Sequence, residues 1–212
     1  SFLVSHDIMP FITLIIPCYN RTSMLEALIQ SIPATEKLEI ILVDDHSTED
    51  FYRVNLQKFQ HHKIIKNKPG QRYAGTARNT GVEYASGEYI FFADSDDLIV
   101  SEGFSKCLEI LERERPDVLF AKAKSFKDYD GSRGGRHLRH NWLVDSVLQG
   151  GSPEILVRSA VPWAKFIRKN FLKDHQVFFE SCRYSNDIVF SALLMVSGPV
   201  IRVSENFVYS IR

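Results

Sequence analysis

The sequence has little cysteine and no excess of charge. Its three cysteines, Cys18, Cys107 and Cys182, show no zinc-site or disulfide spacing, which is typical of a reducing compartment and favours a cytoplasmic protein. The 26 basic residues balance 26 acidic ones, so no basic field would draw the chain onto nucleic acid. No apolar run approaches the roughly 20 residues that span a bilayer, and the opening segment lacks the charged-then-apolar order of a secretory signal.

The length and composition favour one globular domain. A chain of 212 residues, 44% of them hydrophobic, can bury a sizeable core, and we expect a single domain over residues 1–212. The chain opens at Ser1 without Met and stops at Arg212 straight after a strand-like run. We therefore expect that sequence beyond Arg212 has been removed or is disordered.

Strand and helix patterns alternate through the first half. Buried strands are expected at Phe11–Pro17, Leu38–Val43 and Glu88–Ala93, and further strands at Lys63–Asn67 and Asp117–Ala123. Helices are expected at Ser23–Ile32, Tyr73–Tyr84 and Ser101–Arg115. Repeated strand–helix–strand units predict an α/β fold with a mostly parallel central sheet and helices on both faces.

The second half is less regular. Tyr129–His140 is polar and rich in Gly and Arg, which predicts a loop. A segment around Trp163 has no clear period. A helix is expected at Asp187–Val196, and strand-like pieces at Val200–Val203 and Phe207–Ile211.

Acidic residues follow two of the predicted strands. Asp44 and Asp45 end one strand, and the run Asp94–Asp97 ends another. In open α/β sheets that edge binds ligands, and converging carboxylates repel one another unless a cation lies between them. Mg²⁺ or Mn²⁺ prefers oxygen ligands and often bridges to phosphates, so the pattern predicts a metal–diphosphate site. Arg72 and Arg78 lie between the two clusters and are suited to phosphate.

Five stretches in order along the chain resemble the family 2 glycosyltransferases of the GT-A fold. They run from Phe11 to about Asp187, and the combination is far more specific than any one piece. The stretches are TLIIPCYN (Thr13–Asn20), VDDHS (Val43–Ser47), ARNTGVEYASGEYIFFADSDD (Ala77–Asp97), PWAKFIRKNFL (Pro162–Leu172) and ND (Asn186-Asp187).

The resemblance implies a donor site in the nucleotide-sugar-binding part, at about residues 11–123. Pro17 and Tyr19 match residues that flank the nucleoside, and Asp45 matches the acid that hydrogen-bonds the base, usually uracil. Asp94 matches the first acid of the DxD motif, near the ribose, and Asp96 the acid that binds the metal. The implied donor-binding residues are Pro17, Tyr19, Asp44, Asp45, Arg72, Arg78, Asp94 and Ser95.

The resemblance also implies an acceptor part at about residues 124–212. Trp163 and Lys165 match a Trp-x-Lys element near the donor sugar and the acceptor, and Asp187 matches the catalytic base. This chain has Asn186 where the family more often has Glu.

The expected function is inverting, metal-assisted transfer by a hexosyltransferase-type enzyme. A sugar would pass from a nucleoside diphosphate sugar, most often a UDP-sugar, to a hydroxyl of a growing glycan or a lipid-linked acceptor. A single displacement needs no protein nucleophile, which agrees with the lack of a Ser/His or Cys/His signature.

Two alternatives stay open. One is a nucleotidyltransferase of similar fold, although PCYNRTS stands where its Gly-rich phosphate loop would be. The other is a non-catalytic fragment that binds sugar nucleotides.

Basic residues gather in one region of the second half. They are Lys124, Lys127, Arg133, Arg136 and Arg139. Such a group can meet an anionic acceptor or a lipid surface. We therefore expect peripheral contact with the inner face of a membrane, without a spanning segment.

Overall fold

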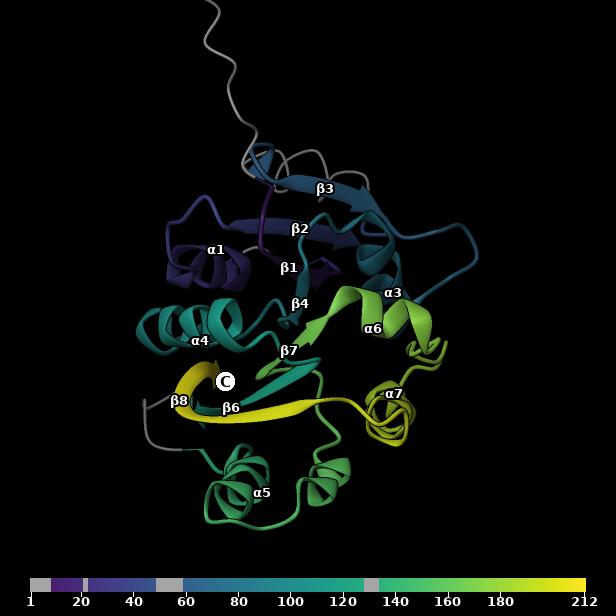
Figure 1. Cartoon of the computed structure of the whole chain (residues 1–212). Helices are drawn as coiled ribbons and strands as arrows, with labels where there is room; N and C mark the ends of the chain where they lie inside the picture. The colour runs from purple at the N-terminus through teal and green to yellow at the C-terminus, as the bar shows by residue number, and fades with distance from the viewer. Residues whose placement is uncertain (1–8, 21–22, 49–58, 128–133) are drawn as a thin grey trace, which may run out of the picture.

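A single eight-stranded sheet runs through the molecule. The computed structural model describes residues 9–20, 23–48, 59–127 and 134–212. The strand order across the sheet is β3-β2-β1-β4-β7-β6-β8-β5, and most of it can be followed from top to bottom in Figure 1. The strands are β1 Ile12–Cys18, β2 Leu38–Asp44, β3 Lys63–Lys66, β4 Tyr89–Phe92, β5 Leu98–Ile99, β6 Val118–Ser125, β7 Lys165–Arg168 and β8 Ile201–Ile211.

The strand directions divide the sheet into two regions. Strands β3, β2, β1 and β4 are parallel to one another, and β6 is parallel to β8. Strand β7 is antiparallel to both β4 and β6, and β5 is antiparallel to β8. The predicted α/β class with a mostly parallel central sheet is confirmed, and β7 joins the parallel half to the second half of the chain.

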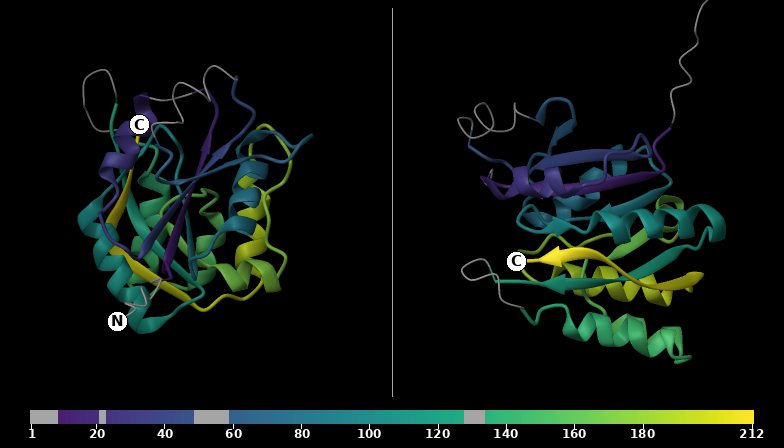
Figure 2. Two further views of the ribbon diagram at one scale, coloured as in Figure 1. Left: turned by 90° about the horizontal axis from the view of Figure 1, so that it is seen from above. Right: turned by 90° about the vertical axis from the view of Figure 1, so that its left-hand side faces the viewer.

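Helices cover both faces of the sheet, as predicted. The helices are α1 Ser23–Ser31, α3 Tyr73–Tyr84, α4 Ser101–Glu114, α5 Leu138–Leu148, α6 Lys169–Asp174 and α7 Asn186–Val196, with a 3₁₀ helix at Pro153–Arg158. Helices α1 and α4 supply Leu28 and Phe104 to one core cluster. Helices α3, α5, α6 and α7 supply residues such as Ala77 and Phe190 to the cluster on the other face. Figure 1 shows α1 and α4 on the left of the sheet and α3, α6 and α7 on the right, and Figure 2 gives two further views.

The first strand explains why the site forms where it does. Every residue of β1 is buried, because helices lie on both faces and strands on both edges. At its carboxyl end the Asp45 amide donates to the Cys18 carbonyl (2.8 Å), and the Ala93 amide donates to the Ile15 carbonyl (3.1 Å). These bonds bring the residues that follow β1, β2 and β4 to one edge of the sheet.

Two expectations for the second half need correction, and one segment for which no structure was expected takes a defined one. The predicted loop Tyr129–His140 ends early, because helix α5 begins at Leu138, and residues 128–133 lie outside the described ranges. The two predicted strand pieces are one strand, β8, whose register against β6 shifts midway. The segment around Trp163 leads into strand β7. For strands β7 and β8, pairing with distant parts of the chain decides the structure.

None of the helices in the described ranges is both long enough and apolar enough to cross a membrane.

Candidate active site

A cavity opens at the carboxyl edge of the parallel strands and gathers most of the predicted donor residues. Its volume is about 370 Å³. Its walls come from the ends of β1, β2 and β4 and from helix α3. The lining residues are Pro17, Cys18, Tyr19, Asp45, Ala74, Arg78, Asp94, Ser95 and Asp96. The two acidic clusters therefore meet in one cavity, as their positions after neighbouring strands predict.

Asp45 is held in a fixed orientation by hydrogen bonds to both carboxylate oxygens. The Asn67 side-chain amide donates to Oδ1 (2.8 Å), and the Tyr73 backbone amide donates to Oδ2 (2.7 Å). Asn67 is buried and is itself anchored by contacts with helix α3. A carboxylate has about four acceptor positions, so Asp45 can accept a further N–H from a ligand. Sequence reasoning missed Asn67, because nothing in its surroundings indicates that it faces Asp45.

Arg78 connects the donor side of the site to the start of helix α7. Its guanidinium donates to Asp94 Oδ1 (2.5 Å) and to Asn186 Oδ1 (3.1 Å), while its Nε lies buried without a hydrogen-bond partner among the described residues. The Arg78 side chain is 6% exposed. Because Asn186 is neutral where the family more often has Glu, Arg78 has a single carboxylate partner here and retains capacity to bind an anion.

Strand β8 supports the acidic run Asp94–Asp97 from behind. The Asp94 amide donates to Tyr209 Oη (2.7 Å), and the Tyr209 hydroxyl also bonds the Asp97 carboxylate. The Arg212 amide donates to Asp97 Oδ1 (2.9 Å). Burial raises the pKa of Asp97 to about 7 and holds the pKa of Tyr209 well above its usual value. A buried tyrosine hydroxyl needs a partner, but the sequence does not show which group supplies it.

A second cavity of about 580 Å³ adjoins the first. The two cavities share Ala74, Arg78 and Asp94. The second one also contains the predicted Trp163 and Asp187, and Asp187 lies in the first turn of α7. Its other lining residues are Arg136, Val161, Pro162, Arg183, Tyr184, Ser185 and Asn186. The predicted base thus lies beside the predicted donor site, in a space large enough for a second substrate.

Trp163 is fixed between two aromatic rings. Its ring stacks on Tyr209 with centroids 5.8 Å apart, and the His140 ring meets it edge-on at 5.1 Å. His140 is buried between the Ser159 hydroxyl and the Ala121 carbonyl, each 2.7 Å away, and burial lowers its pKa to about 4. His140 is therefore neutral near pH 7, and this network assigns the Nε2 proton to the Ala121 bond. The sequence does not indicate this supporting role.

Lys165 lies beneath the second cavity and does not line it. Only 1% of the residue is exposed, and its ammonium donates to the Ser159 and Val161 carbonyls (both 2.6 Å). Burial lowers the pKa of Lys165 to about 7, although the Asp187 carboxylate opposes this change. Lys165 holds the backbone of the segment that carries Trp163, so it acts on a substrate only by positioning that segment.

The buried Lys165 predicts a pH dependence of stability. Between pH 7 and pH 10.5 the folded protein has lost the Lys165 proton while the unfolded chain still holds it. The unfolded state binds more protons there, so this residue makes the free energy of unfolding rise with pH across that range. Lys165→Met should lack this part of the rise. The free energy of unfolding in urea is measured for the wild type and for Lys165→Met near pH 7 and near pH 10.5. The contributions of the other titrating groups cancel when the two proteins are compared. Parallel pH profiles would contradict it.

Several residues with strained backbone lie near these cavities. Positive φ angles at residues other than glycine occur at His46 (62°) after β2, Tyr73 (78°) at the start of α3 and Ala164 (55°) between Trp163 and Lys165. Ser185 (58°) has the same conformation directly before α7. Such angles cost about 1–3 kcal/mol each and persist where surrounding structure imposes them. Each is next to, or within one or two residues of, a residue that the sequence predicts for the site.

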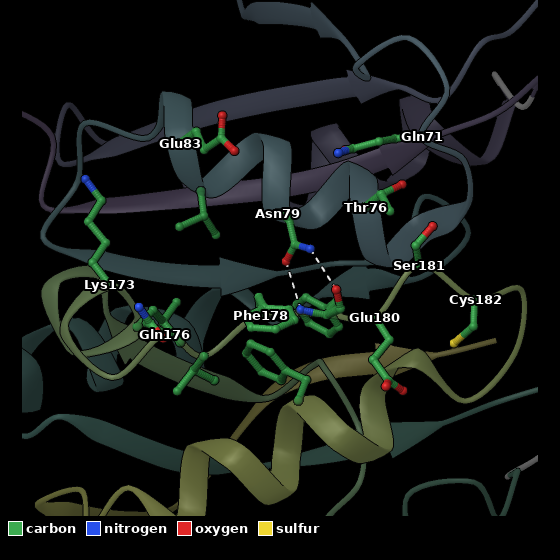
Figure 3. A pocket seen from close by; sticks show the side chains of 15 residues that line it. Gln71, Thr76, Asn79, Glu83, Lys173, Gln176, Phe178, Glu180, Ser181 and Cys182 are labelled. Carbon is green, nitrogen blue, oxygen red and sulfur yellow. Dashed lines mark hydrogen bonds between the residues drawn. The ribbon is translucent and has the colours of Figure 1, made fainter.

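A larger cavity, about 710 Å³, lies between α3, α6 and the segment before α7, and contains none of the predicted site residues (Figure 3). The Asn79 side-chain amide donates to the Phe179 carbonyl (2.8 Å) and accepts from the Phe179 backbone amide (2.9 Å), and both hydrogen bonds are drawn as dashed lines. The Phe179 ring lies 5.2 Å below the Arg78 guanidinium. Gly75 allows this close packing, because a Cβ there would lie 2.8 Å from the Glu180 carbonyl. This region ties the segment before α7 to helix α3.

The predicted metal site has suitable donor atoms but is incomplete without a substrate. Asp94, Ser95 and Asp96 present hard oxygen atoms to the first cavity, and one Asp94 oxygen is engaged by Arg78. In the part of the chain that the structure describes, no three acidic, histidine or cysteine side chains cluster as metal ligands. Mg²⁺ and related ions are often held by one or two carboxylates plus substrate phosphates, so these residues fit such an ion.

Some predicted site residues lie outside both cavities. Arg72 is exposed at the start of α3 and lines neither, and Asp44 is buried, where it accepts from the Ser47 amide (3.1 Å). The basic residues are also separated: Arg136 lines the second cavity and Lys124 a different one, whereas Arg133 lies outside the described residues. Contact with a membrane stays a prediction.

Comparison with known proteins identifies relatives over most of the chain. Residues 13–176 match the family described as Glycosyl transferase family 2. Poly(ribitol-phosphate) beta-glucosyltransferase of Bacillus spizizenii is 26% identical over 211 residues, which cover 93% of this chain and 31% of the relative. The chain therefore spans about a third of that protein's length.

Solved structures share the fold. TarS 1–349 of S. aureus in complex with UDP-GlcNAc has a TM-score of 0.74 at 23% identity, covering 94% of this chain and 58% of that one. A mannosyltransferase of Pyrobaculum calidifontis in complex with GDP-Man and Mn²⁺ has a TM-score of 0.65 at 16% identity, covering 95% and 56%. At these identities the likeness establishes the GT-A arrangement of strands and helices.

Proposed function

Because the chain belongs to glycosyl transferase family 2, we propose that it is an inverting glycosyltransferase that uses a UDP-sugar. One observation carries the proposal: the donor-type cavity with Asp45, Asp94 and Asp96 shares a wall with the cavity that contains Asp187. Two substrates bound in these cavities would meet near Arg78 and Asp94. That is the arrangement that direct transfer between a donor and an acceptor requires.

The donor base would be recognised at Asp45. Uracil carries one ring N–H donor between two carbonyl groups, and a carboxylate is a suitable acceptor for that N–H. Asn67 and the Tyr73 amide keep the Asp45 carboxylate in place before any ligand binds, which lowers the entropy cost of recognition. Tyr19, which is 59% exposed, lies beside this position and can cover the nucleoside.

The chemistry would take place where the two cavities join. Asp187 takes the proton from the acceptor hydroxyl as its oxygen attacks the anomeric carbon, and the bond from that carbon to the diphosphate breaks. A single displacement from the opposite side inverts the anomeric configuration. Arg78 lies near the departing diphosphate and, with one carboxylate partner, can donate to it.

A divalent cation, Mn²⁺ or Mg²⁺, belongs to the proposal. Asp96, with Asp94 nearby, would hold it, and the cation would neutralise charge that develops on the diphosphate. The mannosyltransferase of the same fold, solved with Mn²⁺, supports this choice.

The test is a thermal-shift screen with UDP, GDP and ADP, each with Mn²⁺ or with EDTA. We expect UDP with Mn²⁺ to raise the melting temperature most, because a ligand at a hundredfold excess over its Kd stabilises by about 2.7 kcal/mol. Release of sugar from UDP-GlcNAc or UDP-glucose in the same buffers then separates an enzyme from a binding module.

Three other outcomes would revise the proposal. Equal increases in melting temperature with all three nucleotides would contradict recognition of the base by Asp45. Binding of UDP without any release of sugar would favour the non-catalytic alternative. The absence of any nucleotide effect would reject the proposed function.

The acceptor side of the proposal is a hydroxyl of a glycan or of a lipid-linked acceptor, in polysaccharide synthesis. The relatives' names support this class, since they include a transferase that acts on poly(ribitol-phosphate). A cytoplasmic location with peripheral membrane contact is part of the same proposal, and co-sedimentation with anionic and neutral vesicles would test that contact.

A further inference from the structure

The second cavity is lined by more positively charged side chains than its ion pairs neutralise. Three guanidinium groups line it: those of Arg78, Arg136 and Arg183. Arg78 is engaged by Asp94 and Asn186. Neither Arg136 nor Arg183 forms an ion pair with a carboxylate in the part of the chain that the structure describes.

These two arginines come from distant parts of the chain. Arg136 precedes helix α5, and its Nη1 donates to the Arg212 carbonyl (2.8 Å), which holds it at the end of strand β8. Arg183 lies in the segment before α7, with its guanidinium 5.3 Å from the centre of the Tyr184 ring. Each contact orients the side chain and leaves most of its N–H donors available. The fold therefore brings two partly oriented arginines to one cavity.

The charges facing this cavity do not balance. Of the two carboxylates in the lining, Asp94 is neutralised by Arg78, and Asp187 alone remains opposite Arg136 and Arg183. A neutral sugar acceptor would use neither guanidinium as a charge. A phosphate ester would use both, because the planar guanidinium matches two phosphate oxygens and the charges are complementary.

We propose that the second cavity binds an acceptor that carries phosphate, a polyol-phosphate chain, with its phosphate on Arg136 and Arg183 and a nearby hydroxyl at Asp187. The inference rests on the proposed function, since it names the acceptor for the same site. Trp163 and Tyr184 supply apolar surface for the carbon chain between successive phosphates. The poly(ribitol-phosphate) transferase among the relatives agrees with this acceptor class.

The test measures binding of a short synthetic ribitol-phosphate oligomer by calorimetry. It is titrated into the protein with and without UDP and Mn²⁺, and free ribitol serves as the neutral probe. We expect the oligomer to bind at least about tenfold more tightly than ribitol, and Arg136→Gln with Arg183→Gln to remove most of that difference. The preference should weaken as salt is raised, because it depends on charge.

A matched variant and a nucleotide control make the result specific. Arg139→Gln removes the same charge from the first turn of α5 but does not line the cavity, so it should leave oligomer binding unchanged. UDP affinity should also stay unchanged in the double variant, because both arginines lie outside the first cavity.

Each contrary outcome overturns the inference. Equal binding of oligomer and ribitol by the wild-type protein would do so, even if UDP binds and the proposed function stands. A parallel loss of UDP affinity in the double variant would assign the arginines to the donor diphosphate. Loss of binding to anionic vesicles with oligomer binding intact would assign them to a membrane surface. Absence of UDP binding in the wild type would instead count against the proposed function.

Discussion

Asp187→Asn is expected to lower the rate of sugar transfer by about 100-fold or more while UDP affinity stays unchanged. Asp187 lies in the first turn of α7 and faces the second cavity. There the positive end of the helix dipole favours the ionised carboxylate, which a base needs in order to accept a proton. Asparagine keeps the shape and removes only the proton acceptor. Transfer rate and UDP affinity measured side by side on the variant check the prediction.

The controls separate catalysis from helix stability. The residue before α7, Ser185, makes no side-chain capping bond, so Asp187 could also stabilise the helix start. Asparagine favours helix starts nearly as well as aspartate does, so a purely structural Asp187 would leave activity near the wild-type level. Asp174→Asn, an exposed position at the end of α6, is the matched control and should have no effect. Near-normal turnover in Asp187→Asn would reject the base assignment.

Asp96→Asn is expected to weaken metal-dependent UDP binding by about 100-fold or more. Asp96 and Asp94 both face the first cavity, but one Asp94 oxygen is already bonded to Arg78. Asp96, which matches the metal-binding acid of the DxD motif, would supply the principal protein ligand to the cation, and a cation on a diphosphate is worth several kcal/mol. UDP titrations with Mn²⁺ and with EDTA, on both proteins, measure the effect.

Asp94→Asn should weaken binding less than Asp96→Asn. It leaves the metal ligand in place and loosens Arg78, which keeps its bond to Asn186. Glu102→Gln, which changes an exposed carboxylate on α4, is the control for overall charge. If Asp96→Asn bound UDP as tightly as the wild type and with the same response to EDTA, the metal assignment would be wrong. A larger loss in Asp94→Asn would transfer that role to Asp94.

The patterns along the sequence determined the parallel, N-terminal half of the fold in most respects. Strands such as β1 and β2 are covered on both faces, so their apolar runs are visible locally, and helix α3 follows the predicted bounds Tyr73–Tyr84. The acidic clusters follow strands of one parallel region, so the strand order alone brings Asp45 and Asp96 to one edge. The order of the motifs then indicated glycosyl transferase family 2, and the match over residues 13–176 confirms it.

Only the tertiary structure decided how the second half completes the site. Strand β7 has four residues and no clear period, and its place depends on pairing with β4 and β6. The bond from Asp94 to Tyr209 joins residues 115 positions apart, and no local pattern encodes such a contact. Such pairings and hydrogen bonds depend on which elements pack together, and that packing is a property of the whole chain.

The Trp-x-Lys element shows the same division between sequence and structure. The resemblance to the family implied that both side chains belong to the site, but it did not distinguish the two positions. Ala164, with its positive φ, turns the chain between them. Trp163 then lines the second cavity, packed between His140 and Tyr209, whereas the Lys165 ammonium is buried on backbone carbonyls beneath it. The sequence indicated most of the residues that gather at the two cavities, and long-range packing decided which of them line a cavity and which support it from beneath.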